Sequence, residues 1–264
     1  MKGRNIMLLL DKLIAEKNIG YKGGIYHRLQ VDFAYNSNHI EGSSLTHDQT
    51  RYIYETKTIG LDSDNVVKVN DIIETVNHFR CFDYIIDTVS EPLTEEYIKK
   101  IHFLLKTGVL EESPSIIGNY KKEANMVGEI ETALPEEVPD KMNKLLSEYS
   151  NKQSMTLYDI AFFHTKYEAI HPFYDGNGRT GRLIMFKQCL ENNIVPFYID
   201  DFHKMYYYKG LKEWQTESKN ERLINVFLSS QDHMKKLMNY FKIDYDPTDL
   251  KYQDVMKQAN HNLL

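Results

Sequence analysis

The stretch HPFYDGNGRTGR, residues 171–182, lies between two segments of helical periodicity and decides how the chain is expected to fold. Pro172 ends the preceding helix, because the residue before a proline is disfavoured in the α region. Three glycines then allow a tight turn that exposes backbone N–H groups. The turn leads into a second helix, so this stretch predicts an anion-binding helix N-terminus inside a helix–loop–helix unit.

Apolar residues recur at helical spacing on both sides of this loop. The segments are residues 25–40, 66–89, 94–105, 141–149, 157–170, 183–190 and 223–241, with Thr94 as the N-cap of the third. Seven prolines and 13 glycines separate these segments, and no repeat or low-complexity linker divides the chain. The sequence therefore predicts a mostly α fold in one continuous globular domain.

One stretch departs from the helical pattern. Residues 120–135, YKKEANMVGEIETALP, have Gly128 in their middle and weak period-two segments on either side. This pattern suits a short hairpin or an irregular flap. A hairpin with an open edge can accept a peptide strand, whereas a plain surface loop cannot, and the pattern leaves both open.

Composition excludes several classes of protein. With 42% hydrophobic and 27% charged residues, the chain is in the ordinary globular range, and its net charge of −6 argues against a nucleic-acid-binding surface. The N-terminal apolar patch, residues 6–10, is shorter than the ~7–15 residues of a signal-peptide core and far below the ~20 that span a membrane. Cys81 and Cys189 form no metal or redox motif, so we expect buried thiols in a reducing cytoplasm.

The loop at 171–182 carries the residue types that phosphate chemistry needs. Arg179 and Arg182 are three apart and share a helix face, so they can hold successive phosphates of a di- or triphosphate. Asp175 offers one hard oxygen ligand for Mg²⁺ shared with phosphate oxygens. His171 can take a proton from an incoming nucleophile near neutral pH. Together these residues predict phosphoryl or nucleotidyl transfer.

Each residue alone has an ordinary explanation. A histidine at a helix end is usually a cap, DGNG is usually a turn, and two arginines usually form a solvated face. An EF-hand is excluded, because counting from Asp175 places Thr180 at the glycine position and Phe186 at the glutamate position. The chain also contains no Walker GxxxxGK[ST] motif.

Residues 171–182 match every fixed position of HxFx(D/E)GNGRxxR, and the chain resembles the Fic family on this motif. GNYK at 118–121 resembles the family's G-x-Y-R, with Lys121 in place of arginine, and YYKGL at 207–211 resembles its Y-Y-x-A-L. The resemblance covers residues 25–230 approximately. It implies an α-helical fold with a short β-hairpin flap and the transfer of AMP from ATP to a protein hydroxyl.

The resemblance also implies roles for single residues. His171 would be the general base and Asp175 the ligand of a Mg²⁺ cofactor. Nucleotide would be bound by Gly176, Asn177, Gly178, Arg179, Arg182, Tyr207 and Tyr208, and the target-positioning flap would include Asn125, Met126, Val127 and Gly128. The catalytic core would be residues 61–230, preceded by N-terminal helices in 1–60 and followed by a helical extension in 231–264.

A second element, SNHIEG at residues 37–42, ends the helical segment that begins near residue 25. Ser37 and Glu41 are four apart and share a face, and Gly42 is expected as the C-cap. A glutamate at this end of a helix is disfavoured by the helix dipole, and a solvated surface glutamate is its commoner form. These residues match the (S/T)xxxE(G/N) inhibitory motif of Fic proteins, which implies pairing of Glu41 with Arg182 and a slow resting enzyme.

Alternatives remain at this point. The chain can be a nucleotide-sensing regulator that modifies no target, an enzyme that removes AMP, or an enzyme that uses UTP, GTP or a phosphocholine donor. The expected partners are ATP, a target protein and, as in relatives of this layout, further copies of the chain. Neither nucleic acid nor membrane is expected as a partner.

Overall fold

The computed structural model describes residues 8–60, 66–110, 113 and 116–245. Part of the N-terminal apolar patch (residues 6 and 7) and the end of the expected C-terminal extension (246–264) lie outside the described residues. Within these ranges, no helix combines the length and apolar character that crossing a membrane requires.

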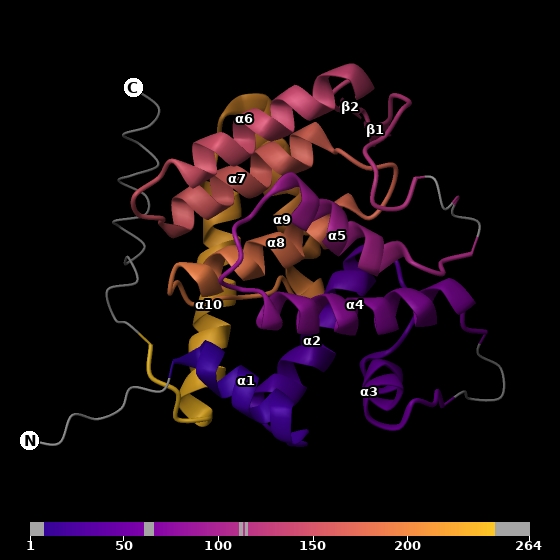
Figure 1. Ribbon diagram of the computed structural model, residues 1–264, viewed down its shortest axis with the longest axis vertical. Coiled ribbons are helices and arrows are strands. Elements are labelled where there is room, and N and C mark those ends of the chain that lie inside the picture. The colour runs from indigo at the N-terminus through magenta and orange to yellow at the C-terminus, as the bar shows by residue number, and fades with distance from the viewer. Residues whose placement is uncertain (1–7, 61–65, 111–112, 114–115, 246–264) are drawn as a thin grey trace, which may run out of the picture.

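The fold is mostly α with one small antiparallel hairpin, which confirms the predicted class (Figure 1). The helices are α1 Leu9–Ile19, α2 Ile25–Ile40, α3 His47–Thr56, α4 Val69–Asp87, α5 Glu95–Lys106, α6 Val138–Ser150, α7 Leu157–Ile170, α8 Asn177–Glu191, α9 Lys204–Glu217 and α10 Glu221–Tyr240. The hairpin strands are β1 Met126–Val127 and β2 Ile130–Glu131, and short 3₁₀ turns η1 and η2 cover Pro135–Glu137 and Asp201–His203.

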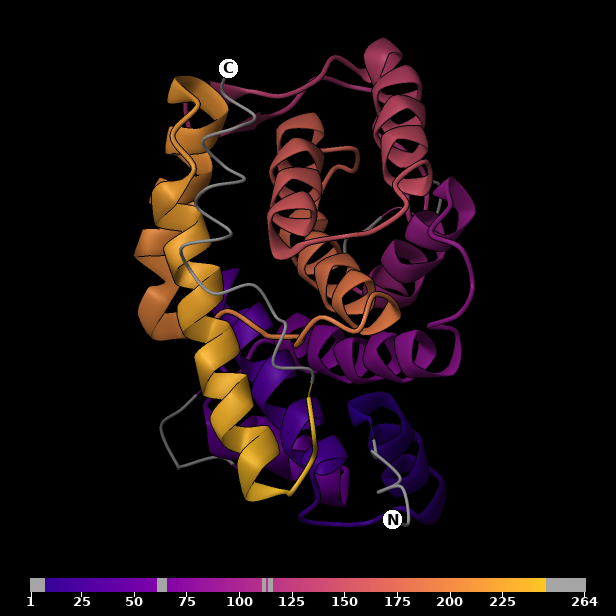
Figure 2. The same ribbon diagram turned by 90° about the vertical axis from the view of Figure 1, so that its left-hand side faces the viewer.

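Helix α8 is the central helix of the molecule (Figures 1 and 2). Every residue in it except Gly178 and Glu191 is buried, and it packs against α2, α4, α5 and α7. Three of the buried residues, Arg179, Arg182 and Lys187, are cationic. Because a buried cation is stable only with a partner, the surrounding helices must supply carboxylates or carbonyls to α8.

Helix α2 brings the second sequence element to α8. It packs on α4 and α8, and most of its residues are buried. Its C-cap is Glu41, and Gly42 is the next residue, in the left-handed conformation at φ 94°. The predicted glycine therefore lies one position beyond the cap, where such a conformation closes a helix end.

Helices α3 and α9 are among those outside the seven segments of helical periodicity, although α3 falls within residues 1–60, where the resemblance implied N-terminal helices. In α3 the buried residues are Gln49, Thr50 and Ile53, so only one of them is apolar. In α9 they are Tyr207, Gly210 and Leu211, with the rest of the helix partly or fully exposed. In α3, Ile53 is the one buried apolar residue, whereas Tyr207, Leu211 and Trp214 of α9 follow the helical spacing and pack in one cluster.

Candidate active site

The conformation of the loop between α7 and α8 is fixed by contacts of its side chains. His171 caps α7 in the left-handed conformation at φ 51°. Phe173 is fully buried and stacks on His102 of α5, with ring centroids 3.8 Å apart. The Asn177 side chain accepts from the Phe173 N–H and donates to the Phe173 carbonyl, both at 2.8 Å. These contacts fix the loop, so the amide of Asn177 is engaged in holding the backbone.

The imidazole of His171 is uncharged at neutral pH. Burial, and then the positive charge of Lys121, lower the pKa of His171 to about 4. Its buried Nδ1 has no hydrogen-bond partner in the part of the chain that the structure describes. A neutral imidazole on a fixed loop is in the protonation state that a general base requires.

The N-terminus of α8 forms a small cradle around Gly178. A Cβ added to Gly178 would collide with the Glu41 carboxylate and come within 3.0 Å of Arg182 Nη1. That Nη1 is buried and, among the described residues, lacks a hydrogen-bond partner. Exposed N–H groups, a helix dipole and an arginine with a spare donor favour an anion here, and the Glu41 carboxylate is the anion present.

Glu41 and Arg182 form an ion pair. Arg182 Nη2 is 2.7 Å from Glu41 Oε1, and the arginine side chain is 1% exposed while that of Glu41 is 30% exposed. Ser37 binds the same guanidinium, with its hydroxyl 3.1 Å from Nε and its carbonyl 2.9 Å from Nη2. The sequence element at 37–42 thus supplies three contacts to one arginine, and its Glu41–Arg182 pairing is as the resemblance implies.

The second arginine of the loop is held by a cluster that the sequence did not predict. Arg179 Nη1 is 2.5 Å from Glu74 Oε2, and its Nη2 is 3.4 Å from Asp175 Oδ2. Lys106, at the end of α5, contacts the same two carboxylates. Glu74 and Lys106 belong to helices far from residues 171–182 in sequence, and only the fold brings them to the site.

Asp175 is charged and half exposed. Burial raises the pKa of its carboxyl, but Arg179 and Lys106 outweigh burial and hold the pKa at about 2. Its side chain is 57% exposed. No group of three or more His, Cys, Asp or Glu side chains suited to a metal occurs among the described residues. Because Mg²⁺ usually takes one or two carboxylates together with substrate phosphates and water, a lone accessible Asp175 fits that ion.

The two tyrosines of α9 lie beside the Glu41–Arg182 pair. The buried Tyr207 shares a 2.7 Å hydrogen bond with His164, and its ring centroid is 5.9 Å from the Arg182 guanidinium carbon. Tyr208 donates to the Ile40 carbonyl at 3.2 Å. Their hydroxyls are therefore bound to protein groups, and the tyrosines border the site from the α9 side.

The expected flap is a hairpin bound to the loop between α7 and α8. β1 pairs with β2 in the register Met126↔Glu131 and Val127↔Ile130, with Gly128 left-handed in the turn. The Met126 and Val127 side chains are exposed. Asn125 donates to the Phe173 carbonyl at 3.1 Å, so the hairpin begins where the loop is anchored.

Lys121 couples this flap to His171. Its buried ammonium is 2.6 Å from both Asn125 Oδ1 and Thr132 Oγ1, and 3.4 Å from the Ile170 carbonyl that precedes His171. Lysine in place of the arginine of G-x-Y-R thus still binds both ends of the flap and the loop.

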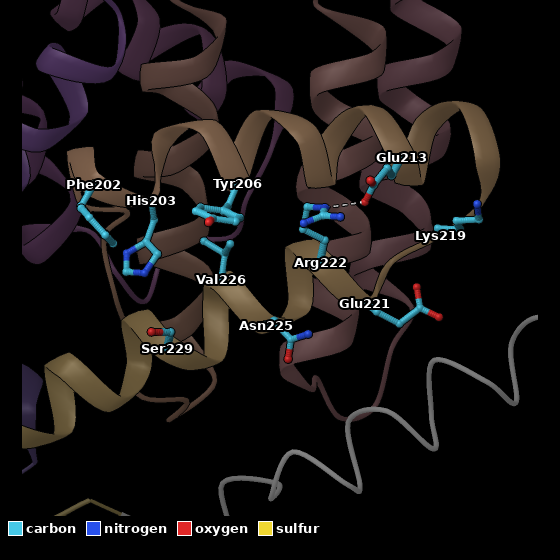
Figure 3. A pocket seen from close by; sticks show the side chains of 10 residues that line it. All are labelled: Phe202, His203, Tyr206, Glu213, Lys219, Glu221, Arg222, Asn225, Val226 and Ser229. Carbon is cyan, nitrogen blue, oxygen red and sulfur yellow. Dashed lines mark hydrogen bonds and ion pairs between the residues drawn. The ribbon is translucent and has the colours of Figure 1, made fainter.

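A cavity lies away from this site, between α9 and α10 (Figure 3). Its volume is about 730 Å³, and Figure 3 shows Arg222 directed at Glu213, with 2.7 Å between Arg222 Nε and Glu213 Oε2. Phe202 and Tyr206 also line it. None of its lining residues belongs to 171–182 or 37–42, so this cavity is separate from the candidate site.

The chain is similar to a known family and to several named proteins. Residues 92–189 match the Fic/DOC family. A protein adenylyltransferase Fic from Nematostella vectensis is 30% identical over 179 residues, which are 66% of this chain and 41% of the relative. One from Aedes aegypti is 26% identical over 193 residues, 69% of this chain and 36% of the relative. The matched part is thus less than half of these relatives' length.

Solved structures share the fold. A Fic domain containing signaling protein from Bacteroides thetaiotaomicron superposes with a TM-score of 0.66 at 22% identity, over 95% of each chain. Fic-1 from C. elegans superposes with a TM-score of 0.68 at 18% identity, over 88% of this chain and 72% of that one. At these identities the likeness is one of fold.

Proposed function

Because this chain carries a Fic/DOC family domain at residues 92–189, we propose that it is a protein adenylyltransferase that moves AMP from ATP to a hydroxyl side chain of a target protein. We further propose that Glu41 keeps the resting enzyme slow. The observation that carries the proposal is that residues 171–182 hold both a neutral His171 and an anion-binding cradle. In this cradle, Arg182 Nη1 has no hydrogen-bond partner among the described residues.

In the proposed reaction, the N-terminus of α8 and Arg182 bind the phosphates of ATP. The target hydroxyl gives its proton to His171 as its oxygen forms a bond to the α-phosphorus, and the bond from that phosphorus to the β-phosphate oxygen breaks. Pyrophosphate leaves, and AMP remains on the target. Asp175 would hold Mg²⁺, which when bound neutralises charge on the leaving pyrophosphate.

The flap would place the target chain. The exposed strand residues Met126 and Val127 offer backbone N–H and C=O groups at a hairpin edge, which an extended target segment can pair with. Asn125 and Lys121 fix the edge relative to the loop that carries His171. Backbone pairing would hold the target hydroxyl in line with the α-phosphate without selecting its side chains strongly.

Glu41 would inhibit by occupying the cradle. Its carboxylate takes up the Arg182 fork that a terminal phosphate needs, so ATP can bind only with its α-phosphate poorly aligned for attack. The same carboxylate could instead orient water to remove AMP from a modified protein. A regulator that binds ATP without modifying a target is the remaining alternative.

Incubation with Mg²⁺ and α-³²P-ATP tests the proposal. Transfer predicts label on a protein, either this chain or one from a lysate, and intact-mass measurement after incubation with ATP, GTP or UTP identifies the donor. Binding of ATP without any labelled protein, in the parent and in Glu41→Gly alike, would reject transfer in favour of the sensing role.

Asp175→Asn is expected to shift the midpoint of the Mg²⁺ titration of transfer to higher concentration by at least about tenfold. The amide keeps the shape of the side chain but removes the charge, and losing even an outer partner of a metal typically costs ~10–100-fold in metal affinity. Asp140→Asn, at an exposed position on α6, is the matched control. Identical titration curves for Asp175→Asn and the parent would exclude the metal-binding role.

The rate of transfer is expected to stay nearly flat from about pH 8 to about pH 5.5, whereas a histidine of ordinary pKa, ~6.5, would lose roughly nine-tenths of its base form over that range. The profile is expected to be flat because the pKa of His171 is lowered to about 4, so the imidazole stays neutral until the solution is more acidic than this range. The measurement is kcat/KM against pH at saturating Mg²⁺. A rate that halves between pH 6 and 7 would contradict a buried, neutral base.

A further inference from the structure

Lys106 is a buried lysine beneath the nucleotide site. It is the last residue of α5, and its side chain is 2% exposed. Nζ is 2.8 Å from Glu74 Oε1 and 2.5 Å from Asp175 Oδ2. A lysine is among the residues most rarely buried, and it is stable there only when its charge is paired, so this placement needs a reason.

The stem of Lys106 passes directly under the loop. A Cβ added to Gly176 would come within 3.3 Å of Lys106 Cδ, so the absence of a side chain at Gly176 makes room for the lysine. One turn earlier on α5, His102 donates through Nε2 to the Asp175 carbonyl at 2.9 Å. Helix α5 thus holds Asp175 at two points, its backbone through His102 and its carboxylate through Lys106.

Four charges form a closed cluster here. Lys106 and Arg179 are the cations, and Glu74 and Asp175 are the carboxylates, each cation contacting both. Of the four, Asp175 alone has a mostly exposed side chain. The cluster is neutral, and its exposed corner is the carboxylate at the nucleotide site.

In the proposed function, Asp175 has two opposing effects, and this cluster offsets one of them. Asp175 must be ionised to hold a divalent cation, but an ionised carboxylate repels the phosphates of a nucleotide that arrives without one. A cation fixed behind Asp175 offsets that repulsion, while the Asp175 side chain, 57% exposed, stays accessible to a metal. Resting on the proposed function, we infer that Lys106 is a positioning residue that orients Asp175 and lets a nucleoside diphosphate group bind before, or without, Mg²⁺.

The test is ADP binding by calorimetry to the full chain, in EDTA and in saturating Mg²⁺. Lys106→Met keeps the length of the stem and removes the charge. It is expected to weaken ADP binding in EDTA by about thirtyfold, since one unit charge ~8 Å from a phosphate charge at an effective dielectric near 20 has that effect. With Mg²⁺ present the loss should be no more than about threefold, because the divalent cation then neutralises Asp175.

Three further variants make the result specific. Lys100→Met, on the exposed face of the same helix, should leave both affinities unchanged. Lys106→Arg keeps the charge and should restore most of the affinity in EDTA. Glu74→Gln removes a carboxylate and keeps both cations, so it should strengthen ADP binding in EDTA, the opposite direction to Lys106→Met. If Lys106→Met does not fold, this opposite shift in Glu74→Gln decides the matter.

Equal losses with and without Mg²⁺ in Lys106→Met, or weaker ADP binding in Glu74→Gln, would overturn the inference and indicate a purely structural cluster. Because ADP binding involves no transfer, a parent that binds ADP with the expected metal dependence but labels no protein would reject the proposed reaction and leave this inference standing. If the parent labels protein but Lys106→Met binds ADP with unchanged affinities, the inference on Lys106 is rejected and the proposed reaction stands.

Discussion

Replacing His171 is expected to lower AMP transfer by about 10²–10⁴-fold, the usual worth of a positioned general base, while leaving the affinity for ATP within about threefold. Rate and affinity are expected to change separately because different groups act on the target hydroxyl and on the phosphates. His171 would act on the target hydroxyl, whereas the α8 N-terminus and Arg182 would hold the phosphates. Single-turnover labelling gives the rate, and calorimetry with ATP gives the affinity.

The choice of variant matters because His171 has φ 51°. Alanine is strained in the left-handed region, but asparagine adopts it readily, so His171→Asn removes the base without forcing the loop to change. His233→Ala, at an exposed position on α10, controls for loss of an arbitrary histidine. Transfer by His171→Asn at the parent rate would show that another group takes the proton.

Glu41→Gly is expected to increase AMP transfer by about tenfold to a hundredfold, because hydrogen bonds to a charged group are typically worth ~1.5–3 kcal/mol. Without the carboxylate, one N–H of Arg182 Nη2 is released from its 2.7 Å contact and joins Nη1 as a donor for a phosphate, while Nη2 keeps its bond to the Ser37 carbonyl. The measurement is the initial rate of label transfer from α-³²P-ATP with Mg²⁺, with nucleotide affinity determined in parallel.

Glycine at position 41 also loosens the end of α2, so a second variant is needed. Glu41→Gln keeps the backbone and volume and removes only the charge, and it should activate in the same direction. The double variant Glu41→Gly with Arg182→Ala should be no faster than Arg182→Ala alone, because activation through the freed arginine vanishes when the arginine is absent. No gain in either single variant would reject self-inhibition while leaving the Fic assignment in place.

Removal of AMP gives a different pattern. If Glu41 orients water, Glu41→Gly accumulates more modified protein because loss of AMP stops, and the initial rate of transfer is unchanged. Chasing pre-labelled protein with unlabelled ATP separates the two: release of label by the parent and not by Glu41→Gly supports removal.

Much of the fold could be read from the chain because burial repeats with the helix period. The segments predicted at 25–40 and 157–170 coincide with α2 and α7. In α8, in contrast, apolar periodicity was found only at residues 183–190, and the start of the helix near Arg179 was expected from the loop motif; the helix begins at Asn177. Its first six residues, NGRTGR, carry no apolar period, and the two arginines among them are buried because carboxylates outside this helix pair with them.

The site was predictable where its residues are contiguous or match a motif, and not where it is assembled across the fold. Glu41 and Arg182 are 141 residues apart, and their pairing was expected only from the resemblance. Lys106 lies 69 residues from Asp175 at the end of an ordinary amphipathic helix. Nothing local distinguishes it from a solvated lysine in the last turn, so its burial could come only from the structure.

The burial of α2 restricts how Glu41 can leave the cradle. Ser37, Asn38 and Ile40 are each no more than 2% exposed, so the last turn of α2 is clamped into the core, whereas the Glu41 side chain is 30% exposed. Withdrawing the helix would expose that core, but swinging one side chain about its χ angles would not, and such rotamer changes are fast. On the proposed function, the switch between resting and active enzyme would be a single-side-chain gate, and activation would leave the hydrodynamic radius and the scattering profile of the protein unchanged.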